Sequence, residues 1–250
     1  MTTFNIYFKN LKNINQLVKE AFREKSVLSK GELASFLIKY YPDWAEQTVN
    51  WNIHKLKEEG VIHHVSRGKY SLEPVNEYKP SIPNSLKRLH NRIKKEFPYV
   101  EFCVWDSRWF NEFMIHQLFR YQLVAEVEKD VLESVFSSIT DFSKKAFLNP
   151  DATMYERYVS NFDEAIIVKP LISEAPIVKQ NGYWTAPLEK LLVDVLIDKD
   201  LFAAQQGEVE NIYREANEKY SINKQKMRRY ASRRNQQDEV EKYLSKISAI

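Results

Sequence analysis

Glycine is scarce in this sequence, because the 250-residue chain holds 5 Gly. None of them belongs to a GxGxxG or GxxxxGK[ST] run, the loops whose backbone N–H groups hold nucleotide phosphates. The sequence therefore disfavours P-loop and Rossmann proteins. The single Cys103 excludes an intrachain disulfide and any zinc site built on several cysteines. Its apolar surroundings predict a buried structural thiol.

Long hydrophobic runs are also missing. No stretch of about 18 apolar residues exists, which is the length a membrane-spanning helix needs. Residues 1–10 lack the basic, apolar and small-residue order of a secretory signal. We therefore expect a cytoplasmic protein that makes no membrane contact.

The net charge is +3, but the charged residues are distributed unevenly along the sequence. Residues 97–207 are acidic, and the segments on both sides are basic. Residues 219–234 contain several bases and no acid, a density that attracts phosphate backbones or an acidic protein face, although a solvated helix face has the same pattern. The bases expected to make auxiliary DNA contacts are Arg228, Arg229, Arg233 and Arg234.

Three amphipathic helices are predicted in the first 60 residues. Apolar residues recur at helical spacing from Leu11 to Lys25 and again after Ser29. Ser29 and Glu32 have the spacing of a capping box, and Tyr41-Pro42 ends this second helix. The third helix is expected to begin at the N-cap Asp43 and to run to Glu59, with Gly60 as its left-handed C-cap.

The third predicted helix has two different sides. Val49, Ile53 and Leu56 cluster on one side of the helical wheel, which is typical of a buried stripe. The other side mixes hydrogen-bonding, aromatic and basic groups suited to base edges and phosphates in a major groove. These candidate DNA contacts are Gln47, Thr48, Trp51, His54 and Lys55. The alternative for Trp51 is packing against a neighbouring domain.

A β-hairpin is predicted directly after the third helix. Residues 61–65 and 70–72 read as short strands joined by a tight turn in which Gly68 supplies a positive φ. The turn carries Arg67 and Lys69, two bases suited to contact phosphates. Three helices followed by such a hairpin are typical of a winged helix-turn-helix, which binds DNA or serves as a protein-docking or dimerisation unit. Neighbouring His63 and His64 point to opposite faces of a strand, so we expect no metal or other cofactor.

The predicted fold class is α+β. The expected parts are a winged helix-turn-helix (1–73), a proline-containing linker (74–84), a small mixed α/β domain (85–207) and a helical basic tail (208–250). The α/β domain is expected to have about four or five strands. Its predicted elements are strands at 99–105, 117–128 and 165–171, a hairpin around Asn181-Gly182, and helices at 85–96, 108–116, 131–147 and 186–198, the last capped by Thr185. The basic face of residues 85–96 is suited either to phosphate contacts or to solvent.

An enzymatic function is not expected. Asp106, Glu126 and Glu128 follow the strand pattern of a metal-dependent nuclease, which needs two acids and a Glu-x-Lys pair to hold Mg²⁺. Lys129 directly follows Glu128, so that spacing fails. A divergent nuclease remains an alternative to DNA-binding regulation.

The sequence also resembles a known family. Residues 44–72 have the form W-x₆-W-x-I-x₂-L-x₃-G-x-I followed by V-x-R-G-x-Y-x-L, which resembles the amino-terminal winged helix of AbiEi-type antitoxins of type IV toxin–antitoxin systems. Residues 186–194 resemble a helix of their second domain, and residues 105–136 are similar to an AbiEi-related group of uncharacterised Bacteroidetes proteins.

The resemblance implies a function and partners. It implies a bacterial transcriptional regulator that binds double-stranded DNA at the operator of its own operon and acts as antitoxin to a nucleotidyltransferase toxin. It carries over Arg67, Gly68 and Tyr70 of the hairpin. It also carries over Asp194, for which apolar neighbours predict a structural role. The first alternative function is a protein-interaction module that neutralises a toxin without binding DNA, and the divergent nuclease is the second alternative. The sequence leaves homodimer formation open.

Overall fold

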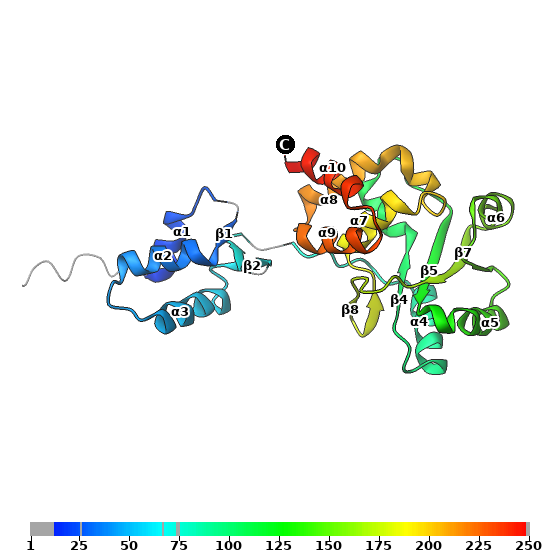
Figure 1. The fold of residues 1–250 in the computed structure, drawn as a ribbon, viewed down its shortest axis with the longest axis horizontal. Helices are drawn as coiled ribbons and strands as arrows, with labels where there is room; N and C mark the ends of the chain where they lie inside the picture. The colour runs from blue at the N-terminus through cyan, green and yellow to red at the C-terminus, as the bar shows by residue number, and fades with distance from the viewer. Residues whose placement is uncertain (1–12, 26, 67, 74–75, 249–250) are drawn as a thin grey trace, which may run out of the picture. The chain divides into compact units, whose positions relative to one another are not determined.

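The computed structural model describes residues 13–25, 27–66, 68–73 and 76–248 (Figure 1). The chain divides into two compact units, Met1–Glu77 and Tyr78–Ile250, and each is treated by itself. The fold is mixed α+β, with a three-stranded sheet in the first unit and a six-stranded sheet in the second.

The first unit packs three helices on its small sheet. Its described elements are α1 (Ile14–Ala21), β1 (Leu28–Ser29), α2 (Lys30–Tyr40), α3 (Glu46–Glu58), β2 (His63–Ser66) and β3 (Lys69–Ser71). The strands are antiparallel in the order β1-β3-β2. Residues from every helix and from the sheet share one core, including the fully buried Val18, Leu28, Leu33 and Ile62. The two-residue strand β1, which pairs Leu28 with Tyr70, is absent from the sequence prediction because it is too short to show an alternating pattern.

The helix boundaries of the first unit agree with the sequence at α2 and differ at α3. Ser29 Oγ accepts the Glu32 N–H (3.1 Å) and Glu32 Oε2 accepts the Ser29 N–H (2.8 Å), which confirms the capping box. The predicted cap at Asp43 is wrong, because α3 has Ala45 as its N-cap. The Trp44 N–H donates to the Tyr41 carbonyl (3.1 Å) and the two rings stack 4.1 Å apart, which forms a turn instead of a helix.

The second unit is built on the six-stranded sheet, in the order β6-β7-β5-β4-β9-β8. Its strands are β4 (Phe102–Asp106), β5 (Tyr121–Val127), β6 (Ala146–Leu148), β7 (Glu164–Pro170), β8 (Val178–Gln180) and β9 (Tyr183–Thr185). Its α-helices are α4 (Asn84–Glu96), α5 (Leu132–Phe142), α6 (Ala152–Arg157), α7 (Leu188–Ile197), α8 (Val209–Lys219), α9 (Lys224–Arg233) and α10 (Gln237–Ser248). Its 3₁₀ helices are η1 (Ser107–Phe113), η2 (Lys129–Val131), η3 (Val159–Asn161) and η4 (Ala203–Glu208).

Two groups of helices cover the two faces of this sheet. The α4 and α5 helices lie on one side, and α7 to α10 lie on the other (Figure 1). Strand alternation explains this division, because Glu126 and its cross-strand partner Cys103 face α7, whereas Phe102 faces His90 of α4 with ring centres 5.1 Å apart. Parallel pairing joins β5, β6 and β7, and an antiparallel pair joins β4 to β5.

Three sequence predictions for this unit are wrong. The sheet has six strands instead of four or five. The helix expected to reach Phe147 ends at Phe142, because residues 146–148 pair with β7 as strand β6. Thr185 does not cap α7, since it lies in β9 and Pro187 occupies the N-cap.

Residues 78–83, which the sequence assigns to the linker, are bonded to the second unit. The Trp109 Nε1–H donates to the Ser81 carbonyl (2.9 Å), and Gln180 Nε2 donates to the Pro80 carbonyl (2.7 Å). The division between units falls after Glu77, within the expected linker 74–84.

Lys190 of α7 forms a buried ionic centre in this unit. Its Nζ lies 2.5 Å from Glu126 Oε1 and 2.5 Å from Asp194 Oδ2, and all three side chains are essentially inaccessible to solvent. Trp105 Nε1–H also donates to Glu126 Oε1 (2.7 Å), and the Tyr230 hydroxyl donates to Asp194 Oδ1 (2.8 Å). The sequence predicted apolar neighbours for Asp194. In the structure its partners are instead the charged and polar side chains of Lys190 and Tyr230.

The ionic centre continues to α9 and β7. Arg234 donates to Asp194 Oδ1 (2.6 Å) and to Asp198 Oδ1 (2.5 Å), and Lys169 Nζ lies 2.5 Å from Asp198 Oδ2. Three cations therefore balance three carboxylates. We call this set the ionic cluster: Glu126, Lys169, Lys190, Asp194, Asp198 and Arg234.

The cluster shifts the pKa values of its members. Burial alone would lower the pKa of Lys190, but Asp194 and Glu126 raise it well above its usual value. Burial opposes ionisation of Glu126, yet Lys190 and Lys169 hold its pKa below the usual value. The pKa of Asp194 is raised, because burial outweighs the attraction of Lys190. Lys190 is therefore held as a cation between its carboxylate partners.

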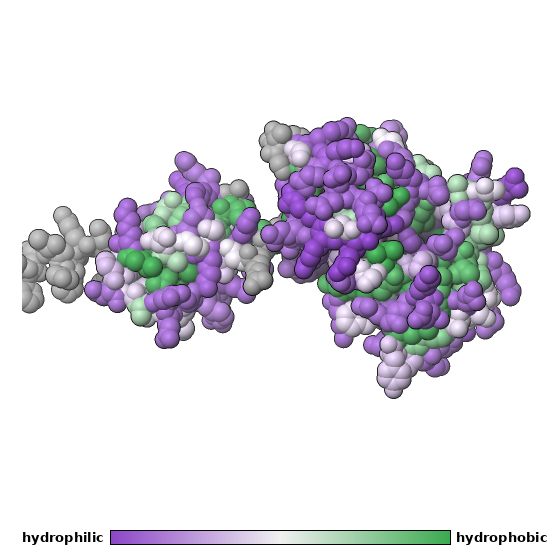
Figure 2. Space-filling view, in the orientation of Figure 1, coloured by the Kyte–Doolittle hydropathy of each residue, from purple (hydrophilic) through white to green (hydrophobic). Residues whose placement is uncertain are grey.

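The helices of the expected tail belong to the core of the second unit. Ile212, Tyr213, Met227, Tyr230 and Leu244 are almost fully buried in the same cluster as the sheet. The visible surface over α8, α9 and α10 is mostly hydrophilic (Figure 2). Residues 209–248 therefore form amphipathic helices that pack on the domain.

No helix in the described ranges combines the length and the apolar character needed to cross a bilayer.

Removal of Lys190 should strongly destabilise the second unit. Lys190→Met leaves Glu126 and Asp194 without their shared cation, so we expect a loss of about 3–5 kcal/mol in unfolding free energy. The Cys103 thiol, the one cysteine of the chain, is buried in this unit, so its reaction with a thiol reagent under increasing urea reports opening of the second unit. The matched control is Arg228→Met, whose pair with Glu241 is exposed and should cost less than about 1 kcal/mol. Equal stabilities of the two variants would contradict the importance of the ionic cluster.

Asp198 should make stability depend on acid pH. Burial raises its pKa, but the hydrogen bond from Arg234 and the charge of Lys169 outweigh burial and lower it to about 2. Because the folded-state pKa is depressed, its stabilising contribution is complete above the ordinary value and is lost as pH falls toward 2. Urea midpoints followed by circular dichroism should therefore show a gap between wild type and Asp198→Asn that is full at pH 6 and shrinks below about pH 4. A gap that stays constant over this range would refute the assignment.

Candidate nucleic-acid interface

The α3 helix presents a polar side to solvent. Val49, Asn52, Ile53 and Leu56 are buried against the core of the first unit, which fixes the rotation of the helix. The opposite side is therefore exposed. It carries the residues predicted from the sequence, all of them exposed: Gln47, Thr48, Trp51, His54 and Lys55. We call this set the α3 outer face.

Trp51 lies in the middle of the α3 outer face. Its side chain is 61% exposed, and Lys55 Nζ lies 5.4 Å from the ring centre in a cation–π contact. A large exposed ring beside a cation offers both apolar contact area and charge to a ligand.

Both basic groups of the α3 outer face lie one turn before an acid. His54 Nδ1 lies 3.6 Å from Glu58 Oε2, and Lys55 Nζ lies 3.7 Å from Glu59 Oε1. Exposed pairs of this kind contribute little to stability, so a phosphate can replace either carboxylate at low cost. The sequence reasoning missed Glu58 and Glu59 as partners, although their i, i+4 spacing was the available signal.

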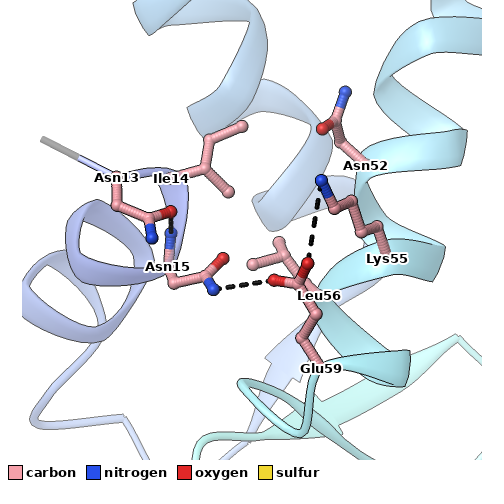
Figure 3. Close-up of a pocket in the computed structure, with 7 residues that line it drawn as sticks. All are labelled: Asn13, Ile14, Asn15, Asn52, Lys55, Leu56 and Glu59. Atoms are coloured by element: carbon pink, nitrogen blue, oxygen red, sulfur yellow. Dashed lines mark hydrogen bonds and ion pairs between the residues drawn. The ribbon is translucent and has the colours of Figure 1, made fainter. Parts of the chain in front are cut away.

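A pocket of about 170 Å³ lies between the start of α1 and α3. Figure 3 shows Asn15 and Lys55 converging on the Glu59 carboxylate from the two helices, with Asn15 Nδ2 donating to Glu59 Oε2 (2.7 Å). The pocket is mostly polar, being lined by Asn13, Ile14, Asn15, Asn52, Lys55, Leu56 and Glu59. Its cation and carboxylate balance each other, so the pocket fixes the end of α3 more than it attracts an ion.

The β2–β3 hairpin carries one of its two predicted bases within the described residues. Lys69 is exposed at the start of β3, next to Gly68, whose φ of +70° is the positive value predicted for the turn. Arg67 lies outside the described residues. His63 is half-buried and His64 exposed, and no group of three metal-ligating side chains occurs in the part of the chain that is described.

The four arginines predicted as auxiliary contacts do not form one free basic face. Arg234 belongs to the ionic cluster and its side chain is 11% exposed. Arg228 forms two hydrogen bonds of 2.8 Å with Glu241, and Arg233 pairs with Glu174. Arg229 is exposed. Helix packing thus directs three of these arginines to carboxylates of the same unit.

Asp106, Glu126 and Glu128, the candidate nuclease ligands, occupy separate positions on or directly after the β4–β5 pair. Asp106 lies opposite Leu123 at one end of the β4–β5 pair and accepts from Arg108 Nε (2.8 Å), whereas Glu128 follows the other end of β5. Glu126 is buried in the ionic cluster. No shared position for Mg²⁺ exists among these three side chains.

These observations define the class of the protein as a two-unit α+β chain whose first unit exposes a polar, aromatic and basic helix face. Residues 48–250 match the sequence profile described as "Family of unknown function (DUF6577)", and the chain belongs to this family. No curated protein matches the chain. The matched region begins inside α3, so most of the α3 outer face lies within it.

Proposed function

We propose that the first unit is a winged helix-turn-helix and that the protein is a DNA-binding transcriptional regulator. The observation that carries this proposal is the α3 outer face, set on a unit with the element order helix, strand, helix, helix, strand, strand. This order and the sheet order β1-β3-β2 are those of a winged helix. In such a unit α3 is the recognition helix and the β2–β3 hairpin is the wing.

The roles of the side chains follow from their place on α3. Gln47 and Thr48 lie in its first turn, the part of a recognition helix that reaches base edges. Gln has the donor and acceptor pair that recognises adenine. Lys55 lies farther along the helix and Lys69 lies on the hairpin, where both are suited to phosphates. Trp51 and His54 supply apolar and hydrogen-bonding contact between these groups.

The DNA is proposed to be the operator of the protein's own operon. This part of the proposal rests on the resemblance to AbiEi-type antitoxins, as does the proposed partner, a nucleotidyltransferase toxin. The second unit would then provide the partner contacts.

Lys55 gives the most direct test of α3. Lys55→Gln removes one phosphate contact, so the slope of log affinity against log salt for a duplex of the promoter region should fall by about 1. The matched control is Lys57→Gln, which removes the same charge from the same helix but outside the α3 outer face. Fluorescence anisotropy over a salt series measures both variants.

A second variant is expected to change DNA affinity in the opposite direction. Glu58 is exposed on the side of α3 that carries Trp51, and its loss frees His54 and removes repulsion of phosphate. Glu58→Gln should therefore bind the duplex more tightly than wild type, by several-fold at low salt. Absence of wild-type binding at low salt, or equal effects of Lys55→Gln and Lys57→Gln, would refute the role of α3.

The antitoxin role requires a separate experiment. Co-expression with a nucleotidyltransferase encoded next to this gene should restore growth that the enzyme alone inhibits. A Lys55→Gln chain should still restore growth while losing operator affinity, because toxin contacts are assigned to the second unit. Continued growth inhibition in the presence of the wild-type chain would count against the antitoxin role and leave DNA binding unaffected.

A further inference from the structure

The α4 helix of the second unit carries a cationic surface that the proposed function does not use. Its buried side is formed by Leu86, Leu89, His90 and Ile93, which pack on the sheet. Basic residues occupy the side turned away from the sheet. We call the following set the α4 basic face: Lys87, Arg88, Lys94 and Lys95.

These four cations differ from the other bases of the same helix. Arg92 pairs with Glu96 (3.0 Å) and donates to Ser138 Oγ (3.2 Å), and it neutralises the one acid of α4. For the four residues of the α4 basic face, no ion pair is present within the described part of the chain. Their charge is therefore available to a ligand.

The spacing of the α4 basic face suits a polyanion. At 100° per residue the four side chains fall within roughly a third of the helix circumference, with Asn91 between them. Lys87 and Lys95 are separated by about 12 Å along the axis at 1.5 Å per residue. Phosphates of one DNA strand recur about every 3.4 Å of duplex axis, so a segment of this length meets several of them.

The β8–β9 hairpin packs against the buried side of α4 through His90. The Trp184 N–H donates to His90 Nε2 (3.1 Å), and the rings of His90 and Tyr183 are 5.0 Å apart, which fixes the hairpin against the helix. His90 lies beside Lys87 and Lys94 at helical spacings of three and four residues. The Trp184 side chain is 38% exposed, with Lys179 Nζ 5.5 Å from its ring centre. Because Tyr183 faces α4, its strand neighbour Trp184 and the cross-strand partner Lys179 lie on the other face of the hairpin, so the basic face is formed by α4 alone.

The composition of the α4 basic face favours nucleic acid over an acidic protein. Asn84 and Asn91 are the other residues of α4 in this arc, so the arc holds no apolar side chain. Protein interfaces bury an apolar and aromatic centre in which lysine is depleted. A row of cations without such a centre is typical of a surface that neutralises phosphates.

We infer that the α4 basic face is a second contact for the phosphate backbone of double-stranded DNA. The inference rests on the proposed function, in which the first unit binds the same duplex. Six residues (78–83) lie between Glu77 and Asn84, so a duplex held by the first unit is at high effective concentration for α4. This contact is independent of base sequence and increases both affinity and salt dependence.

The test compares two full-length variants of equal charge. The α4 variant combines Lys87→Gln, Arg88→Gln, Lys94→Gln and Lys95→Gln. The control variant combines Lys129→Gln, Lys144→Gln, Lys199→Gln and Lys242→Gln, which removes four exposed cations elsewhere on the second unit. Cys103 must stay unreactive in both, which shows that the unit remains folded.

The α4 variant should reduce the slope of log affinity against log salt by about 3.6, at roughly 0.9 for each of its four lost phosphate contacts. Its affinity should fall at least tenfold at low salt, and the control variant should match wild type. The loss should be similar for operator and random duplex, because phosphates carry no base sequence.

The outcomes separate this inference from the proposed function. Weaker binding by Lys55→Gln with an unchanged α4 variant would overturn the inference and leave the function standing. Loss in the α4 variant with an unchanged Lys55→Gln would support the inference and refute the role of α3. Equal losses in the α4 and control variants, or competition by polyglutamate as effective as that by duplex, would also overturn the inference.

Discussion

The stability of the second unit depends on one buried cation, which remains paired with two buried carboxylates. Lys190 lies inside a helix whose residues are almost all buried, and its charge is stable there because Glu126 and Asp194 contact it directly. Arg234 extends this arrangement to α9, so one ionic cluster joins β5, α7 and the last helices of the chain. Buried pairs of this kind are costly to break once formed. The helices after residue 208 are therefore part of the domain.

Pairing with carboxylates of the same unit also determines which basic side chains remain available to a ligand. Residues 219–234 are the most basic stretch of the sequence, yet Arg228, Arg233 and Arg234 are paired with carboxylates of their own unit. Among the residues that the structure describes, the cations of the α4 basic face have no such partners. On α3 the partners are exposed carboxylates that hold their cations weakly. Charge density along the sequence is thus a poor guide to charge available at the surface, because long-range pairing redistributes it.

Local signals in the sequence predicted local structure. The capping box at Ser29, the positive φ of Gly60 and Gly68, the hairpin at Asn181-Gly182 and the two sides of α3 follow from interactions within a few residues, and the structure has each of them. The sequence missed β1 and β6, whose pairing partners are distant in the chain. It also missed the ionic cluster, although Lys190, Asp194 and Asp198 recur every four residues on α7. Their partners on β5, β7 and α9 are set by tertiary packing, which a single sequence does not reveal.

The proposed contact between α3 and a DNA duplex can be tested by lysine acetylation, measured residue by residue with and without duplex. We expect duplex to slow acetylation of Lys55 and Lys69, and of Lys94 and Lys95 on α4, while Lys129 and Lys242 react at unchanged rates. Equal acetylation of Lys55 and Lys69 in the free and DNA-saturated protein would contradict it.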